Sequence, residues 1–181
     1  MKTIKPDFER ILISKEQLDK RIKELASQID IDYAGKKPLF ICILKGSIMF
    51  FTDLLRAITI DCSMDFMSLS SYRNNTTSGE VKMIKDLDEP IVGKDVIIVE
   101  DIIDSGKTLS YLKRLLASRN PNSIKIITML DKPDRRVVEL QPDYTGFVIE
   151  DEFVVGYGLD YAQDYRHYPD IYILSRSVYE K

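Results

Sequence analysis

The sequence predicts an α/β fold in which a mostly parallel, twisted sheet is flanked by helices. Apolar runs of strand length alternate along the chain with stretches whose apolar residues recur at helical spacing. The runs at 39–44 and 96–99 contain no charged or hydroxyl residue, as expected for strands buried on both faces of a parallel sheet. Strands that alternate with helices favour parallel pairing through right-handed crossovers.

Two helices and one strand are predicted in the first third of the chain. A helix is predicted over 14–28, because Ser14 and Gln17 form a capping-box pattern and the apolar residues that follow lie on one face. A Lys-Lys-Pro turn leads into the strand 39–44. We expect an apolar helix to follow this strand and to run through about Ile58.

A β-hairpin is predicted next. Residues 60–69 alternate, with Met64 on the apolar face and Asp65 on the opposite face. The segment 73–79 is polar and is predicted to be a mobile loop. The segment 80–84 alternates again and is expected to return as the second arm of the hairpin.

The second half of the chain predicts a further helix and the remaining strands. Leu109, Leu112 and Leu116 recur at helical spacing. Strands are predicted at 96–99, 124–130, 147–149, 153–155 and 171–174.

Composition bounds the classes of partner. The chain has 181 residues and is expected to form a single domain, 1–181. Its net charge of −3 gives no general reason to expect a nucleic-acid partner. No run approaches the roughly 18 apolar residues of a membrane span, and residues 1–6 lack the apolar core of a signal peptide. Cys42 and Cys62 lie in apolar runs and are expected to be buried free thiols. We therefore expect a cytoplasmic protein with no membrane partner.

The segment 96–109 is the most informative part of the sequence. A buried strand is followed by Glu100, Asp101 and Asp104, then by a Ser-Gly-Lys-Thr turn and a helix start. Such a turn directs backbone N–H groups and the positive end of a helix dipole at one point, which suits a phosphate. It is not a P-loop, because Asp101 stands where a P-loop needs glycine. A dinucleotide fingerprint is absent as well.

The three carboxylates allow more than one interpretation. Adjacent side chains of a strand point to opposite faces, so Glu100 and Asp101 need a break in the strand to serve one ligand. A solvated acidic strand end is the alternative. Asp104 precedes a helix start, where Asp is favoured as the N-cap residue.

The segment 100–108 resembles the ribose-phosphate signature of the type I phosphoribosyltransferases, in the form found in the hypoxanthine-guanine phosphoribosyltransferases. Further matches keep the order and approximate spacing of that family over nearly all of the chain. They lie at 44–47, 71–72, Lys132, 153–157, 159–161 and Arg166.

This resemblance implies the fold of that family, with a core over roughly 36–130 plus returning strands. A small hood is implied from roughly 1–13 and parts of 131–181. It implies a Mg²⁺-dependent transfer from 5-phosphoribosyl-1-pyrophosphate to a 6-oxopurine, hypoxanthine or guanine. A homodimer or homotetramer is also implied.

The resemblance assigns roles to individual residues. Asp104 becomes the general base that faces N7 of the purine. The ribose and phosphate are assigned to Glu100, Asp101, Ser105, Gly106, Lys107 and Thr108, and the metal to Glu100, Asp101 and Asp160. Pyrophosphate is assigned to Lys45, Gly46 and Arg166, the lid to Ser71 and Tyr72, and the purine to Lys132, Phe153, Val154 and Asp160.

Some features remain open. The resemblance implies a cis peptide at Lys45-Gly46, which the sequence cannot show. Ser47, Asp131 and Pro133 depart from the mammalian members of the family, so the preferred purine, xanthine included, stays open. A phosphoribosyltransferase for another base and a regulator that senses the sugar donor without turnover are the alternatives; Lys132 and Phe153 argue against adenine and pyrimidines.

Overall fold

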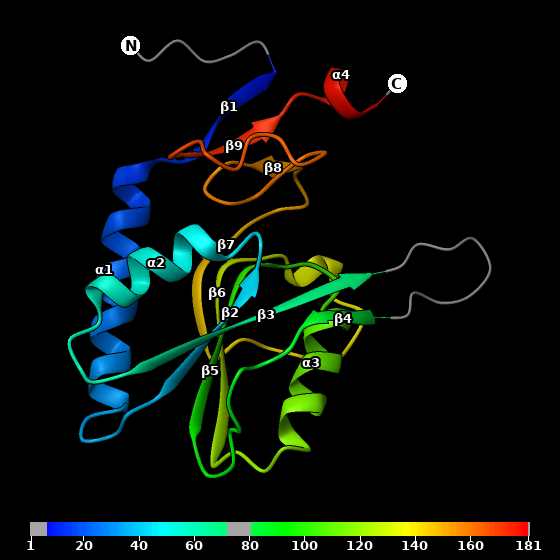
Figure 1. Cartoon of the computed structure of the whole chain (residues 1–181). Helices are drawn as coiled ribbons and strands as arrows, with labels where there is room; N and C mark the ends of the chain where they lie inside the picture. Colours follow the sequence, from blue (N-terminus) through cyan, green and yellow to red (C-terminus); the bar gives the residue numbers. More distant parts are fainter. Residues whose placement is uncertain (1–6, 72–80, 181) are drawn as a thin grey trace.

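A computed structural model describes residues 7–71 and 81–180, which form a large sheet, a small sheet and flanking helices (Figure 1). The large sheet consists, in spatial order, of β4 (Val81–Lys85), β3 (Ser63–Ser71), β2 (Leu39–Leu44), β5 (Asp95–Ile103), β6 (Ser123–Asp131) and β7 (Tyr144–Val148). The small sheet consists of β1 (Phe8–Ile13), β9 (Ile171–Leu174) and β8 (Val154–Val155). The helices are α1 (Lys15–Asp32), α2 (Ile48–Ala57), α3 (Lys107–Ala117), α4 (Arg176–Tyr179) and the 3-10 turn η1 (Pro133–Arg135).

The large sheet confirms the predicted fold class. Its strands pair in parallel except at the β3–β4 hairpin, which is antiparallel. Alternate residues of β2 point to opposite faces: Phe40 packs with α1 and α2, whereas Ile41 packs with α3. The carboxyl ends of β2, β5 and β6 therefore meet at one edge between two helical layers, where open α/β sheets bind ligands.

The small sheet combines segments from the two parts of the chain in which the hood is implied, and it lies above the carboxyl ends of the large sheet (Figure 1). β1 pairs with β9 in antiparallel orientation. β1 was not predicted, because apolar and polar residues do not alternate along it and its partner strand lies about 160 residues further along the chain. The division of the chain into a single domain stays a prediction.

Most predicted elements are confirmed, with shifted ends. The capping box of Ser14 and Gln17 is present, and the helix continues to Asp32 rather than ending at 28. Cys42 is buried, but Cys62 is only half-buried because it precedes β3.

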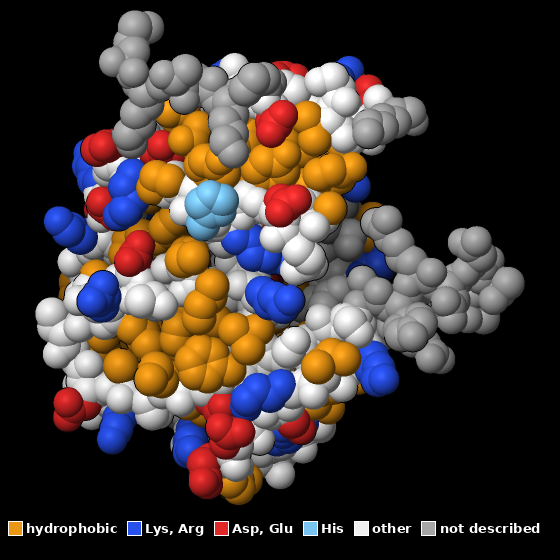
Figure 2. Space-filling model, turned by 45° about the horizontal axis from the view of Figure 1, so that its top comes forward, with side chains coloured by type: hydrophobic (Ala, Val, Ile, Leu, Met, Phe, Trp, Pro, Cys, Tyr) orange, Lys and Arg blue, Asp and Glu red, His pale blue; other side chains and the backbone are white. Residues whose placement is uncertain are grey.

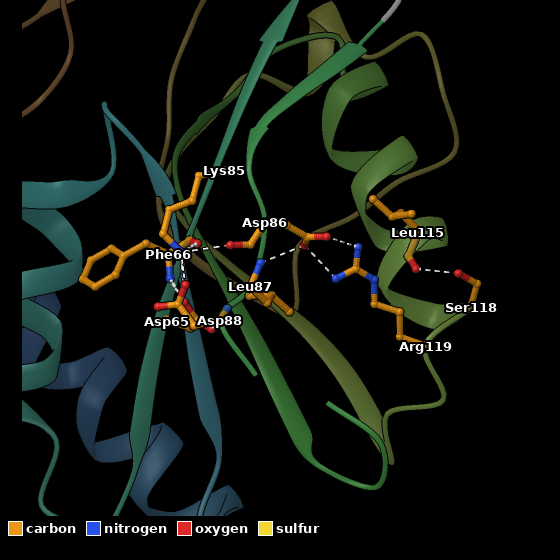
Figure 3. Close-up of polar contacts among 9 residues, drawn as sticks. All are labelled: Asp65, Phe66, Lys85, Asp86, Leu87, Asp88, Leu115, Ser118 and Arg119. Carbon is orange, nitrogen blue, oxygen red and sulfur yellow. Dashed lines mark hydrogen bonds and ion pairs between the residues drawn. The ribbon is translucent and has the colours of Figure 1, made fainter. Parts of the chain in front are cut away.

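The predicted apolar face of β3 is confirmed at Phe66, which packs against the core, but the prediction is wrong at Met64 and Asp65. Met64 is 60% exposed, whereas Asp65 is 7% exposed. Asp65 is buried because its carboxylate accepts hydrogen bonds from the N–H groups of Phe66 and Asp88 and lies 3.5 Å from Nζ of Lys85 (Figure 3). Local partners thus override the apolar pattern.

Two further features bear on partners. None of the described helices is both long enough and apolar enough to cross a membrane. On the face seen in Figure 2, basic and acidic side chains are interspersed rather than gathered into one basic surface.

Candidate active site

Two cavities meet at the carboxyl end of β5. The first, of about 320 Å³, contains the predicted phosphate turn, and the second, of about 670 Å³, contains the predicted purine residues. The two cavities share four lining residues, Asp101, Ile102, Asp104 and Asp160. A ligand with a phosphate at one end and a ring at the other can therefore occupy both.

The phosphate turn, defined as residues 105–108, joins β5 to α3. Gly106 is the N-cap of α3 and has φ +77°, a left-handed conformation that favours glycine. Gly106 has no side chain to cap this helix, and among the described contacts only the Lys107 N–H meets a side-chain acceptor, Oγ of Ser105 at 3.5 Å. The N–H groups of the first turn therefore point out of the helix without intrahelical acceptors. Ser105, Gly106 and Thr108 line the first cavity, which places an anion-binding helix start against it.

Asp104 is not the helix cap, since Gly106 holds that position. Its carboxylate is half exposed and lies 3.5 Å from Nζ of Lys132. Lys132 is 7% exposed, and its Nζ also donates to the carbonyl oxygen of Glu152 at 2.7 Å. A hydrogen-bond acceptor and a donor thus stand side by side at the mouth of the second cavity.

Glu100 and Asp101 line the first cavity together, although β5 continues unbroken to Ile103. A break in the strand is therefore not needed for both carboxylates to line the cavity, since they do so from consecutive positions near the strand end. The Asp101 N–H donates to Oε1 of Glu100 at 3.4 Å, and Oδ1 of Asp101 accepts from the Ile102 N–H at 2.8 Å. Burial raises the pKa of Glu100 well above its usual value, and the Asp101 charge adds to this. Burial also raises the pKa of Asp101.

The carboxylates suit a divalent cation that brings ligands of its own. Carboxylate oxygens are the ligands that Mg²⁺ prefers, and Mg²⁺ is usually held by one or two carboxylates plus water and substrate phosphates. In the part of the chain that the structure describes, no group of three or more His, Cys, Asp or Glu side chains is placed to hold a metal. Glu100 and Asp101 therefore fit a metal shared with a bound substrate rather than a closed protein site.

The loop after β2 packs closely against the carboxylates. A Cβ on Gly46 would lie 1.6 Å from Oδ2 of Asp101, and a Cβ on Gly158 would lie 2.0 Å from the carbonyl oxygen of Gly46. The cis peptide joins Leu44 and Lys45, one residue earlier than the family resemblance implies. Lys45 Nζ lies 3.3 Å from Oε1 of Gln163.

Arg166 and Asp160 close the first cavity from the opposite side. Nη2 of Arg166 lies 2.7 Å from Oδ1 of Asp160, and its Nη1 donates to the carbonyl oxygen of Gly158 at 2.7 Å. Nε of Arg166 is buried and has no partner among the described residues. Asp160 is therefore held by an arginine rather than grouped with Glu100.

Phe153 and Val154 line the second cavity. The ring of Phe153 is 37% exposed, stacks on Tyr179 at 4.8 Å and meets Tyr161 edge-on at 5.6 Å. An exposed aromatic face beside Lys132 suits a planar ring.

The structure brings most of the predicted site residues together, with a few exceptions. Lys45 and Lys107 are exposed and line neither cavity. Ser71 ends β3, but its side chain lies outside the described part, and Tyr72 lies outside the described residues. Sequence reasoning missed several lining residues that lie outside the motifs: Arg135, Asp151, Arg176 and Tyr179.

Comparisons with known proteins agree with this geometry. The phosphoribosyl transferase domain family matches residues 13–162. The hypoxanthine-guanine phosphoribosyltransferase of Bacillus subtilis is 51% identical over 178 residues, which are 98% of this chain and 99% of that protein. The structure of a hypoxanthine phosphoribosyltransferase from Staphylococcus aureus superposes with a TM-score of 0.93 at 46% identity, covering 97% of this chain and 96% of that chain.

A second kind of relative is much longer. The bifunctional protein TilS/HprT of Listeria monocytogenes is 50% identical over 97% of this chain, but the chain spans only 27% of that protein's length. Together with the family match and the full-length relatives, this similarity is decisive: the chain belongs to the phosphoribosyltransferase family, among the hypoxanthine-guanine phosphoribosyltransferases.

Proposed function

We propose that the protein transfers the phosphoribosyl group of 5-phosphoribosyl-1-pyrophosphate to hypoxanthine or guanine, releasing pyrophosphate and a purine nucleoside monophosphate. Family membership and the names of the full-length relatives support this activity. So does the arrangement of two cavities that share a carboxylate-lined junction. The reaction is a purine salvage step.

The pair formed by Asp104 and Lys132 is the observation that carries the proposal. A 6-oxopurine presents the N7 proton and the O6 acceptor on neighbouring atoms of one edge. The carboxylate of Asp104 and the ammonium of Lys132, 3.5 Å apart, match that edge as acceptor and donor. A 6-aminopurine presents a donor to Lys132 instead, so the pair favours 6-oxopurines.

The pair also has a catalytic consequence. Attack by N9 on the ribose builds positive charge on the purine, and a carboxylate at N7 accepts the proton as that charge develops. We assign this role to Asp104. Phe153 provides a stacking face for the purine, and the backbone of Val154 meets its pyrimidine edge.

The phosphate turn and the carboxylates position the sugar. The N–H groups of the turn, with the hydroxyls of Ser105 and Thr108, accept the 5′-phosphate. Glu100 and Asp101 bind the ribose hydroxyls, which fixes C1 between the two cavities.

Membership of this family implies a divalent metal, and we propose that it is Mg²⁺. Glu100 and Asp101 would hold this ion, and Asp160 would hold a second one. The metal neutralises charge that develops on the leaving pyrophosphate. The chain contributes the backbone of Gly46, the charge of Lys45 and the guanidinium of Arg166 to the same leaving group. We assign Ser71 and Tyr72 to a lid that excludes water from the reacting centre.

A panel of bases tests the proposal. The protein is incubated with Mg²⁺, the sugar donor and hypoxanthine, guanine, xanthine or adenine, and nucleotide formation is followed by chromatography. We expect product with hypoxanthine or guanine, little with adenine, and none after chelation of the metal. Absence of product with both 6-oxopurines overturns the proposal.

Assembly and location stay predictions. The family resemblance implies a homodimer or homotetramer, which light scattering of the purified protein measures. A cytoplasmic location and the absence of a nucleic-acid partner also remain predictions.

A further inference from the structure

The segment that follows β6 lies directly behind the phosphate turn. The Lys132 N–H donates to the carbonyl oxygen of Ile103 at 3.0 Å, and the Val137 N–H donates to that of Ser105 at 3.2 Å. These two hydrogen bonds attach the segment on both sides of Asp104. The side chain between them that points toward the turn belongs to Arg136.

Arg136 occupies the space behind Gly106. A Cβ on Gly106 would lie 2.9 Å from Cδ and 3.3 Å from Nη1 of Arg136, and 3.0 Å from Cγ2 of Val138. The back of the turn is therefore covered by these two side chains. Arg136 lines neither of the two cavities of the active site, so it supports the turn from the far side.

The guanidinium is unusually placed for a residue with only a packing role. Its side chain is 12% exposed, and Nη2 forms an ion pair with Asp131, whose side chain is 11% exposed. Nε and Nη1 are buried and have no hydrogen-bond partner among the described residues. Buried donors without partners lower stability, so their presence calls for another explanation. An apolar side chain of similar length would fill the same space without this cost.

We infer that Arg136 is a positioning residue for the phosphate turn. It holds Gly106 from behind in the left-handed conformation that aligns the N–H groups of the turn, and it places a positive charge on the side of the turn opposite the bound phosphate. Asp131 orients the guanidinium, which gives a structural reason for an acid beside Lys132. This inference rests on the proposed function only in assigning the 5′-phosphate of the substrate to the turn.

The test separates phosphate binding from general loss of structure. Affinities for guanosine 5′-monophosphate and for guanosine are measured by calorimetry on the wild type, on Arg136→Met and on Arg136→Lys. We expect Arg136→Met to weaken the affinity for guanosine 5′-monophosphate about tenfold and to change the affinity for guanosine less than about twofold. Arg136→Lys keeps a cation beside Asp131 and is expected to recover part of the loss. Arg114→Met, at an exposed position of α3, is the matched control and is expected to change neither affinity.

Equal weakening of both ligands, or an unchanged affinity for the monophosphate, overturns the inference. If Arg136→Met does not fold, the double variant Asp131→Asn/Arg136→Met removes the unpaired acid as well and gives the same comparison. If that variant also fails to fold, Arg136→Lys decides: an unchanged ratio of the two affinities then overturns the inference. A wild type that does not bind the monophosphate contradicts the proposed function instead, so the two failures are distinguishable.

Discussion

Two acidic clusters in this molecule hold their carboxylates in opposite ways. At the sheet edge, Asp86 accepts two hydrogen bonds of 2.7 Å from Arg119 (Figure 3). Asp65 and Asp88 lie 3.5 and 2.9 Å from Nζ of Lys85. At the end of β5, Glu100 and Asp101 form no ion pair with any residue that the structure describes.

The difference appears in the pKa values. Hydrogen bonds from Arg119 lower the pKa of Asp86, whereas burial raises the pKa of both Glu100 and Asp101. The edge cluster, defined as Asp65, Asp86 and Asp88, stabilises the fold with cations of the chain itself, Lys85 and Arg119. The site cluster, defined as Glu100 and Asp101, keeps two acids close together and thereby lowers the stability of the fold. Such an arrangement suits a site that receives its cation with the substrate.

The largest expected effect is that of Asp104→Asn, which tests whether this carboxylate acts as the general base. Asp104→Asn removes the proton acceptor but keeps the shape, so kcat is expected to fall by about 10²–10⁴-fold. The affinity for the sugar donor should change little, because the proposed function assigns Asp104 to the purine rather than to the donor. Steady-state kinetics and calorimetry with the donor measure the two quantities. An unchanged kcat removes the general-base role.

The second prediction concerns the sign of a stability change. Asp101→Asn removes one of two adjacent acids, so kcat/KM is expected to fall about a hundredfold. The melting temperature should rise, because the remaining Glu100 no longer faces a second negative charge. Thermal unfolding without metal or ligand measures this. A lower melting temperature would show that the pair stabilises the fold as the edge cluster does.

The third prediction is that removal of an acid from the edge cluster lowers stability and leaves turnover unchanged. Asp65→Ala leaves the N–H groups of Phe66 and Asp88 without their acceptor, so the free energy of unfolding should fall by about 1–3 kcal/mol. Turnover should be unchanged at a temperature where the variant is folded. Denaturant unfolding and kcat are measured together, and a loss of kcat without a loss of stability contradicts the comparison.

The smallest expected effect is the pH dependence of an exposed pair. The pKa of Asp86 is lowered in the folded protein, so its stabilisation is present above the unfolded value of 3.8 and is lost as the pH falls through the folded pKa. Solvent screening limits the contribution, and Arg119→Met should cost less than about 1 kcal/mol at neutral pH. Unfolding measured at neutral pH and below about pH 3 should show this cost only at neutral pH. An equal cost at both values argues for packing instead.

The sequence predicts the central features of this fold because their signals are local. The apolar runs of β2 and β5 identify buried strands without knowledge of their neighbours, and Ser14 with Gln17 marks the start of α1. The phosphate turn is equally local, since strand, turn and helix start lie within one short segment.

Other features depend on partners that are distant in sequence. β1 exists because β9 pairs with it, and Asp65 is buried because Lys85 and the Asp88 N–H reach it from the hairpin. Tyr179 lines the second cavity because α4 brings its ring against Phe153. A single sequence contains no local signal for such contacts, so the burial of Asp65 and part of the site could not be predicted.

The pairing of β1 with β9 also has a consequence for synthesis on the ribosome. The six-stranded sheet is complete once β7 has emerged, but β1 must wait until β9 has emerged before Phe8 can pack against Tyr172. During that interval an unpaired strand is exposed, a state open to association with other nascent chains. The roof over the active site is thus completed only after β9 has emerged, later than the large sheet beneath it.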